Sequence, residues 1–115
     1  MKVIIAGSRD FNDYSLLKST LDYMSDIYDD IEIVSGGARG ADSLGEKWAR
    51  ENDIKIHQFI PDWDGLGKSA GYRRNEDLAK FGDAAVCFWN GQSRGTEHMI
   101  NLAKKYNLKI KVVRY

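Results

Sequence analysis

Short apolar segments alternate with longer amphipathic segments along the whole chain. Five apolar runs predict strands, at residues 3–6, 31–34, 54–60, 84–88 and 110–113. Apolar residues spaced three and four apart predict helices, at residues 13–28, 41–52 and 96–106, and one that ends near residue 81. This alternation predicts an α/β fold, a Rossmann-like doubly wound sheet of about five parallel strands with helices on both faces.

Length and composition are those of an ordinary globular protein. With 115 residues, the chain has the usual size for one hydrophobic core, so we expect residues 1–115 to form a single domain. The apolar runs are too short to cross a membrane, and the lone cysteine, Cys87, suits a reducing compartment. We therefore expect a cytoplasmic protein with no membrane partner.

The charges of the chain balance. Seventeen basic residues offset seventeen acidic ones, so the formal net charge is +0. Proteins that bind nucleic acid usually carry a basic excess, and the balance therefore argues against nucleic acid as a partner. A local basic patch remains compatible with it.

The motifs of common cofactors and metals are absent from the sequence. The residues after the first strand, GSRDF, lack the three glycines of a dinucleotide fingerprint, and no Walker motif is present. His57, His98 and Cys87 do not have the spacing of metal ligands. We expect no metal and no resident cofactor.

The loops that follow the first four predicted strands carry most of the glycines and arginines. They cover residues 7–11, 35–42, 61–75 and 89–97. In an open parallel sheet, ligands bind at the carboxyl ends of the strands, near the switch in strand order. We therefore expect one composite site at this edge.

The loop at residues 35–42, SGGARGAD, is typical of a phosphate-binding loop. Repeated glycine lets the backbone approach a ligand, and the N–H groups and dipole at the following helix start attract an anion. Arg39 adds a fork of donors, whereas Asp42 either complements the helix dipole or accepts hydrogen bonds from a ribose. The ligand-binding candidates in this loop are Ser35, Gly36, Gly37, Arg39, Gly40 and Asp42.

The first and fourth loops supply further ligand-binding candidates. Gly7 permits a tight exit from the first strand, Ser8 can bond a phosphate or cap a helix, and Arg9 can grip an anion. Gly95 and Thr96, at the start of the last helix, form a second phosphate cradle.

The loop at residues 61–75 is long for a compact domain, which favours a functional role. Its aromatic rings offer faces for stacking a base, although Trp63 also suits a packing anchor. Arg73 and Arg74 at a helix start oppose the helix dipole unless an anion binds there, and the Asn75 amide can bond a hydroxyl. The candidates in this loop are Trp63, Lys68, Tyr72, Arg73, Arg74 and Asn75.

Taken together, these motifs resemble those of the SLOG superfamily of Rossmann-like domains, and within it the YspA, cpYpsA-related branch. The matching stretches are GSRDF, SGGARGAD, PDW with GKSAGYRRN, and GTEHM. The resemblance implies a nucleotide-type ligand, of the ADP-ribose or NAD-derived kind or a nucleoside monophosphate, bound by a sensor, a scavenger or an adaptor. Relatives often dimerise, so a homodimer stays open.

Two distant relatives imply alternative activities. The LOG group, once labelled lysine decarboxylase-like, cleaves the N-glycosidic bond of nucleoside monophosphates, and this resemblance implies Arg74 and Glu97 as catalytic candidates. Its glutamate motif departs here because Met99 occupies the glutamate position, and Glu97 also suits an ordinary acid at a helix start. Resemblance to DprA implies a module that binds single-stranded DNA. We expect nucleotide binding first, with a phosphoribohydrolase and a DprA-like module as alternatives.

Overall fold

A computed structural model describes the backbone of residues 1–115 and every side chain except those of Trp63, Leu66 and Lys68. Within this backbone, five strands form one parallel sheet in the order β3-β2-β1-β4-β5. The strands are β1 (Lys2–Gly7), β2 (Glu32–Ser35), β3 (Ile56–Gln58), β4 (Ala84–Trp89) and β5 (Lys109–Arg114). The predicted Rossmann-like fold class is therefore confirmed.

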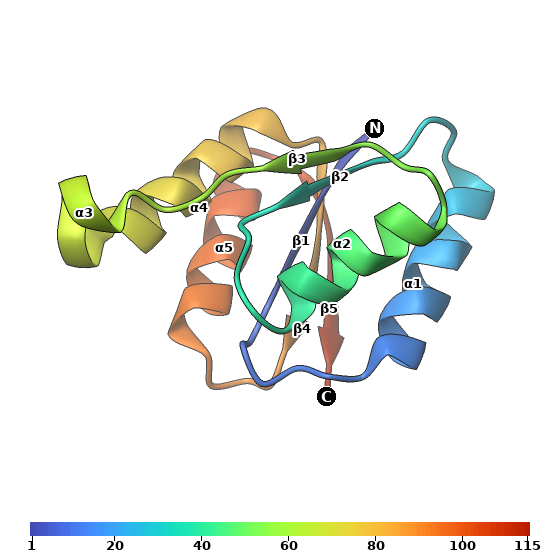
Figure 1. Cartoon of the computed structure of the whole chain (residues 1–115), viewed down its shortest axis with the longest axis horizontal. Helices are drawn as coiled ribbons and strands as arrows, with labels where there is room; N and C mark the ends of the chain where they lie inside the picture. The colour runs from blue at the N-terminus through green and yellow to red at the C-terminus, as the bar shows by residue number, and fades with distance from the viewer.

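Helices cover both faces of the sheet (Figure 1). Helices α1 (Tyr14–Ile27) and α2 (Ala41–Glu51) lie on one face, and α4 (Ala70–Phe81) and α5 (Arg94–Lys105) lie on the other. Successive residues of a strand point to opposite faces, so Val3 and Ile5 of β1 join the core under α1 and α2. Ile4 of the same strand joins the core under α4 and α5.

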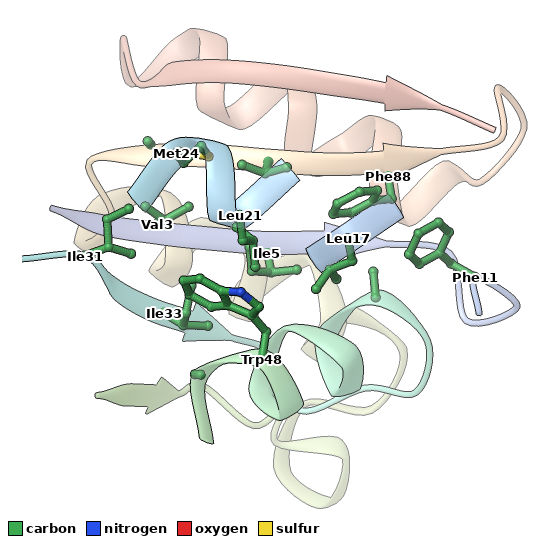
Figure 2. Packing of buried hydrophobic residues seen from close by; sticks show 14 residues of the cluster. Val3, Ile5, Phe11, Leu17, Leu21, Met24, Ile31, Ile33, Trp48 and Phe88 are labelled. Atoms are coloured by element: carbon green, nitrogen blue, oxygen red, sulfur yellow. The ribbon is translucent and has the colours of Figure 1, made fainter. Parts of the chain in front are cut away.

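Large buried side chains fill the core under α1 and α2 (Figure 2). Trp48 of α2 is 1% exposed and lies among Leu21 and Ile33, while its indole N–H donates to Asp22 Oδ1 at 2.9 Å. Phe11 stacks on Phe88 with ring centroids 4.7 Å apart. This contact fixes the loop after β1 against the carboxyl end of β4.

The segment at residues 61–75 differs from the loop that its glycines suggested. It contains a short helix, α3 (Trp63–Leu66), and a 3₁₀ turn, η1 (Gly67–Ser69), and α4 already begins at Ala70. Asp62 Oδ1 accepts the Gly65 N–H at 2.9 Å, as expected of a residue that caps a helix. One glycine costs a helix only about 1 kcal/mol, which packing of α4 on α5 readily offsets. Tyr72, Arg73 and Arg74 consequently lie on a helix.

The strand order reverses between β1 and β4, which are neighbours in the sheet. Chain connections leave β1 toward β2 and β3 on one side, and leave β4 toward β5 on the other. At such a switch point the loops after the two strands diverge to opposite sides. A crevice therefore forms outside the carboxyl ends of these strands. Among the described residues, no helix is long and apolar enough to span a membrane.

Candidate functional site

A cavity of about 460 Å³ opens at the carboxyl ends of β1 and β4, at the switch point of the sheet. Its volume falls within the roughly 300–1,000 Å³ typical of small-molecule sites. All four predicted loop regions contribute to its wall. The expected residues that line it are Gly7, Ser8, Arg9, Asp42, Tyr72, Arg74, Asn75, Gly95 and Thr96.

Arg74 projects from α4 toward the loop after β2. Its Nη1 donates to the Gly36 carbonyl oxygen at 2.6 Å, and its Nε donates to Asn75 Oδ1 at 3.0 Å. These two contacts hold the guanidinium plane in one orientation against the cavity wall. Because a guanidinium carries five N–H donors, donor capacity remains for a ligand.

Arg9 lines the same cavity from the loop after β1. Burial lowers the pKa of Arg74, with Asp42 acting in the opposite direction, and the charge of Arg9 lowers it further. Two positive charges beside one cavity repel each other, and an anion that binds between them relieves this repulsion. The pair therefore has the character of an anion site.

Asp42 lies in the first turn of α2, is 6% exposed and also lines the cavity. Its Oδ2 accepts the Ala38 N–H at 3.2 Å. Burial raises the pKa of Asp42 to about 6, although the Ala38 N–H and the charge of Arg74 act to lower it. A carboxyl group with this pKa can gain or lose a proton close to neutral pH.

The start of α5 forms another part of the cavity wall. Ser93 is the N-cap residue: its Oγ accepts the Thr96 N–H at 3.3 Å and lies 3.0 Å from Thr96 Oγ1. A Cβ atom added at Gly95 would meet nothing within 4 Å, so this position leaves the cavity open. Ser93 was not among the predicted residues, although a serine just before a helix start is a common capping signal.

Asn75 connects α4 to α5 across the base of the cavity. Its Nδ2 lies 3.4 Å from the Gly95 carbonyl oxygen and 3.2 Å from His98 Nδ1, while its Oδ1 accepts from Arg74. His98 also contacts the Tyr72 ring edge-on, with centroids 4.6 Å apart. The Asn75 amide thus positions Arg74, a role that sequence reasoning missed together with His98.

Two glycines of SGGARGAD lie in close packing. A Cβ at Gly36 would lie 2.1 Å from Arg74 Nη1, and one at Gly40, where φ is +80°, would lie 2.3 Å from the Ser8 carbonyl oxygen. At Gly40 the backbone of the loop after β1 fills the space of a side chain, so the two loops can meet only because that side chain is absent. At Gly36 the absence of a side chain leaves room for the Arg74 guanidinium group. In this structure the two glycines shape the cavity wall without lining it.

Other expected residues lie away from the cavity lining. They are Ser35, Gly36, Gly37, Arg39, Gly40, Arg73 and Glu97. Ser35 is buried and donates to Glu46 Oε2 at 2.6 Å, and Glu97 is exposed on α5. The side chains of Trp63 and Lys68 lie outside the described residues, so their predicted roles stay predictions.

Ser8 and Cys87 are the remaining polar groups to consider near the site. Ser8 Oγ is buried in the cavity lining, and the Tyr115 hydroxyl interacts with it, although not in ordinary hydrogen-bond geometry. Burial raises the pKa of Cys87 to about 12, which keeps the thiol protonated at neutral pH. Among the described side chains, no group of three metal-ligating residues gathers.

The sequence of this chain is similar to a known family and to a phage protein. A model of the YspA, cpYpsA-related SLOG family matches residues 1–65. The Gene 61 protein of Mycobacterium phage D29 is 32% identical over 116 aligned residues, which cover 95% of this chain and 93% of that protein.

A similar fold is found in DNA processing protein A from Helicobacter pylori, a structure that describes how that protein binds single-stranded DNA. The TM-score is 0.67 at 23% identity, and the match covers 97% of this chain and 64% of that one. The present chain therefore spans about two thirds of the length of that protein, and the match shows a common fold.

This structural match corrects the expectation drawn from the neutral net charge. A protein with the same fold binds single-stranded DNA, so the argument against nucleic acid as a partner was wrong. Net charge is a sum over the whole surface, whereas recognition depends on the local field. Every arginine except Arg50 lies at or near the carboxyl edge of the sheet, in the loops, helix starts and strand end described above.

Proposed function

The chain belongs to the YspA, cpYpsA-related SLOG family, and from this premise we propose that it binds a nucleotide-type ligand in the switch-point cavity. The proposed class is an ADP-ribose or NAD-derived molecule or a nucleoside monophosphate, bound by a sensor, a scavenger or an adaptor. The observation that carries the proposal is the pairing of Arg9 and Arg74 beside one cavity.

The cavity offers a distinct environment for each part of a nucleotide. The phosphate lies between the Arg9 and Arg74 guanidinium groups, near the positive end of the α5 dipole at Gly95. Tyr72 is 52% exposed on the rim, where its ring is available to stack on a base. Asp42 remains for the sugar, because it accepts hydrogen bonds on the same wall.

Calorimetric titration with AMP and with ADP-ribose tests this proposal. The matched variants are Gly95→Leu, which fills the cavity, and Gln92→Leu, which adds the same side chain at an exposed position outside it. We expect at least one ligand to bind the native protein and Gln92→Leu equally, and to bind Gly95→Leu roughly tenfold or more weakly. Absence of binding by both ligands, or equal binding by both variants, contradicts the proposal.

A second candidate function is the binding of single-stranded DNA, which the match to DNA processing protein A favours. Arg39 and Arg73 support it because both are exposed near the cavity without lining it, where they can reach the phosphates of a longer strand. We expect Arg39→Gln and Arg73→Gln each to weaken binding of a labelled oligonucleotide and to reduce its salt dependence, whereas Arg50→Gln changes neither. No change in fluorescence anisotropy at low salt contradicts this candidate.

The cytoplasm remains the proposed location. The buried, protonated thiol of Cys87 suits a reducing compartment, where a lone cysteine needs no partner.

A further inference from the structure

Asp42 is a buried hydrogen-bond acceptor on the cavity wall. It is 6% exposed, and the described residues place no cation within 4.0 Å of its carboxylate oxygens. The backbone N–H groups of Ala38 and Gly36 approach it from the SGGARGAD loop. A carboxylate provides about four acceptor sites, so two N–H groups leave capacity for a ligand donor.

The other polar side chains that line the cavity carry no negative charge. Asn75 Oδ1 accepts from Arg74 Nε, and its Nδ2 contacts the Gly95 carbonyl oxygen and His98. The Ser93 and Thr96 hydroxyls pair with each other. The arginine side chains are donors only. Asp42 is accordingly the charged acceptor among the described side chains of the cavity lining.

A ligand that satisfies this cavity must carry an anion for the arginines and a hydroxyl donor for Asp42. We infer that Asp42 accepts hydrogen bonds from the ribose 2′- and 3′-hydroxyls and thereby makes the site select ribonucleotides over 2′-deoxyribonucleotides. This inference rests on the proposed nucleotide binding in the same cavity. A site built to bond a hydroxyl rejects an analogue that lacks it, because the buried partner is then left without its hydrogen bond.

The size of the selection follows from the charge of the acceptor. A hydrogen bond to a charged group corresponds to roughly a ten- to hundredfold change in affinity. We expect the native protein to bind AMP more tightly than 2′-deoxy-AMP by about this factor. We expect the same difference in affinity between ADP-ribose and its 2′-deoxy analogue. A purely structural Asp42, which only holds the SGGARGAD loop, gives no such preference.

The test is a set of calorimetric titrations with these pairs, on the native protein and on Asp42→Ala, Asp42→Asn and Asp77→Asn. Asp77 is exposed on α4 outside the cavity lining, so Asp77→Asn controls for the loss of one negative charge. We expect the ribo-to-deoxy ratio to fall toward one in Asp42→Ala and to stay native in Asp77→Asn. Asp42→Asn keeps an oxygen for the Ala38 N–H, so it provides the measurement if Asp42→Ala does not fold.

The outcomes separate this inference from the function on which it rests. Native protein that binds the ribo and deoxy ligands equally overturns the ribose selection and leaves nucleotide binding intact. A native ratio that persists in a folded Asp42 variant also overturns it, because the discriminating acceptor then lies elsewhere. Failure of all four ligands to bind the native protein overturns the proposed function itself.

Discussion

Replacement of Asp42 by asparagine is expected to change how stability depends on pH. The unfolded chain releases the Asp42 proton near the ordinary pKa of 3.8, whereas the folded chain holds it up to about 6. Between these values the folded state binds more protons, so stability falls as the pH rises and the loss is complete above about pH 7. At about 1.4 kcal/mol per pKa unit, the loss is about 3 kcal/mol.

Asp42→Asn removes this loss because the amide has no proton to release in this range, and its oxygen still accepts the Ala38 N–H. The assay is urea unfolding of the native protein and the variant at several pH values from 4 to 8. We expect the stability of the variant relative to the native protein to increase by about 2 kcal/mol from pH 4 to pH 8, because part of the unfolded chain is already ionised at Asp42 at pH 4.

Other groups do not obscure this measurement. Burial lowers the pKa of His98, so this residue lowers the free energy of unfolding as the pH falls. His98 is present in both the native protein and the variant, so its effect cancels in the difference. A stability difference that is constant across the pH range would show that Asp42 does not hold its proton in the folded state. So would a difference that decreases as the pH rises.

Four further substitutions test the packing in and around the site. Gly40→Ala is expected to lower the melting temperature because φ there is +80° and the added Cβ would lie 2.3 Å from the Ser8 carbonyl oxygen, whereas Gly95→Ala has open space and leaves it unchanged or slightly higher; equal melting temperatures contradict this. Asn75→Ala frees the Arg74 side chain, and we expect weaker AMP binding in calorimetry with a melting temperature lowered less than by Trp48→Ala. Trp48→Ala removes the largest fully buried side chain and is expected to cost about 3–5 kcal/mol in urea unfolding, and a cost below about 1 kcal/mol would be incompatible with its burial.

Much of the fold followed from local pattern. Segments rich in apolar residues identified all five strands, although β3 is shorter than the predicted 54–60, and alternation with amphipathic helices determined that their carboxyl ends share one edge. Segment 61–75 was the exception, because it was predicted as a loop and contains helices. Glycine indicates a loop in the sequence, whereas contacts with distant helices decide whether a segment that contains glycine is helical. The Asp62 cap before α3 was a readable local signal for helix in that segment.

Contacts between distant residues explain what the sequence left open at the site. Arg74 and Gly36 are 38 positions apart, so no local pattern predicts that this arginine bonds that carbonyl group. Asp42 had two interpretations, and only the fold shows that its first-turn carboxylate is buried in a cavity wall. Glu97 belongs to the same type of helix position but is exposed, because α5 turns that side away from the cavity.

Nucleotide binding is proposed at one place in the fold, the carboxyl ends of β1 and β4. Its most direct test is an NMR titration of ¹⁵N-labelled protein with ADP-ribose and AMP, which locates a ligand residue by residue. We expect the amide resonances of Arg9, Gly95 and Thr96 to shift most, because these residues line the cavity. Unchanged spectra would contradict it, as would shifts confined to the smaller groove between α1 and β5, which Tyr23 and Lys111 line.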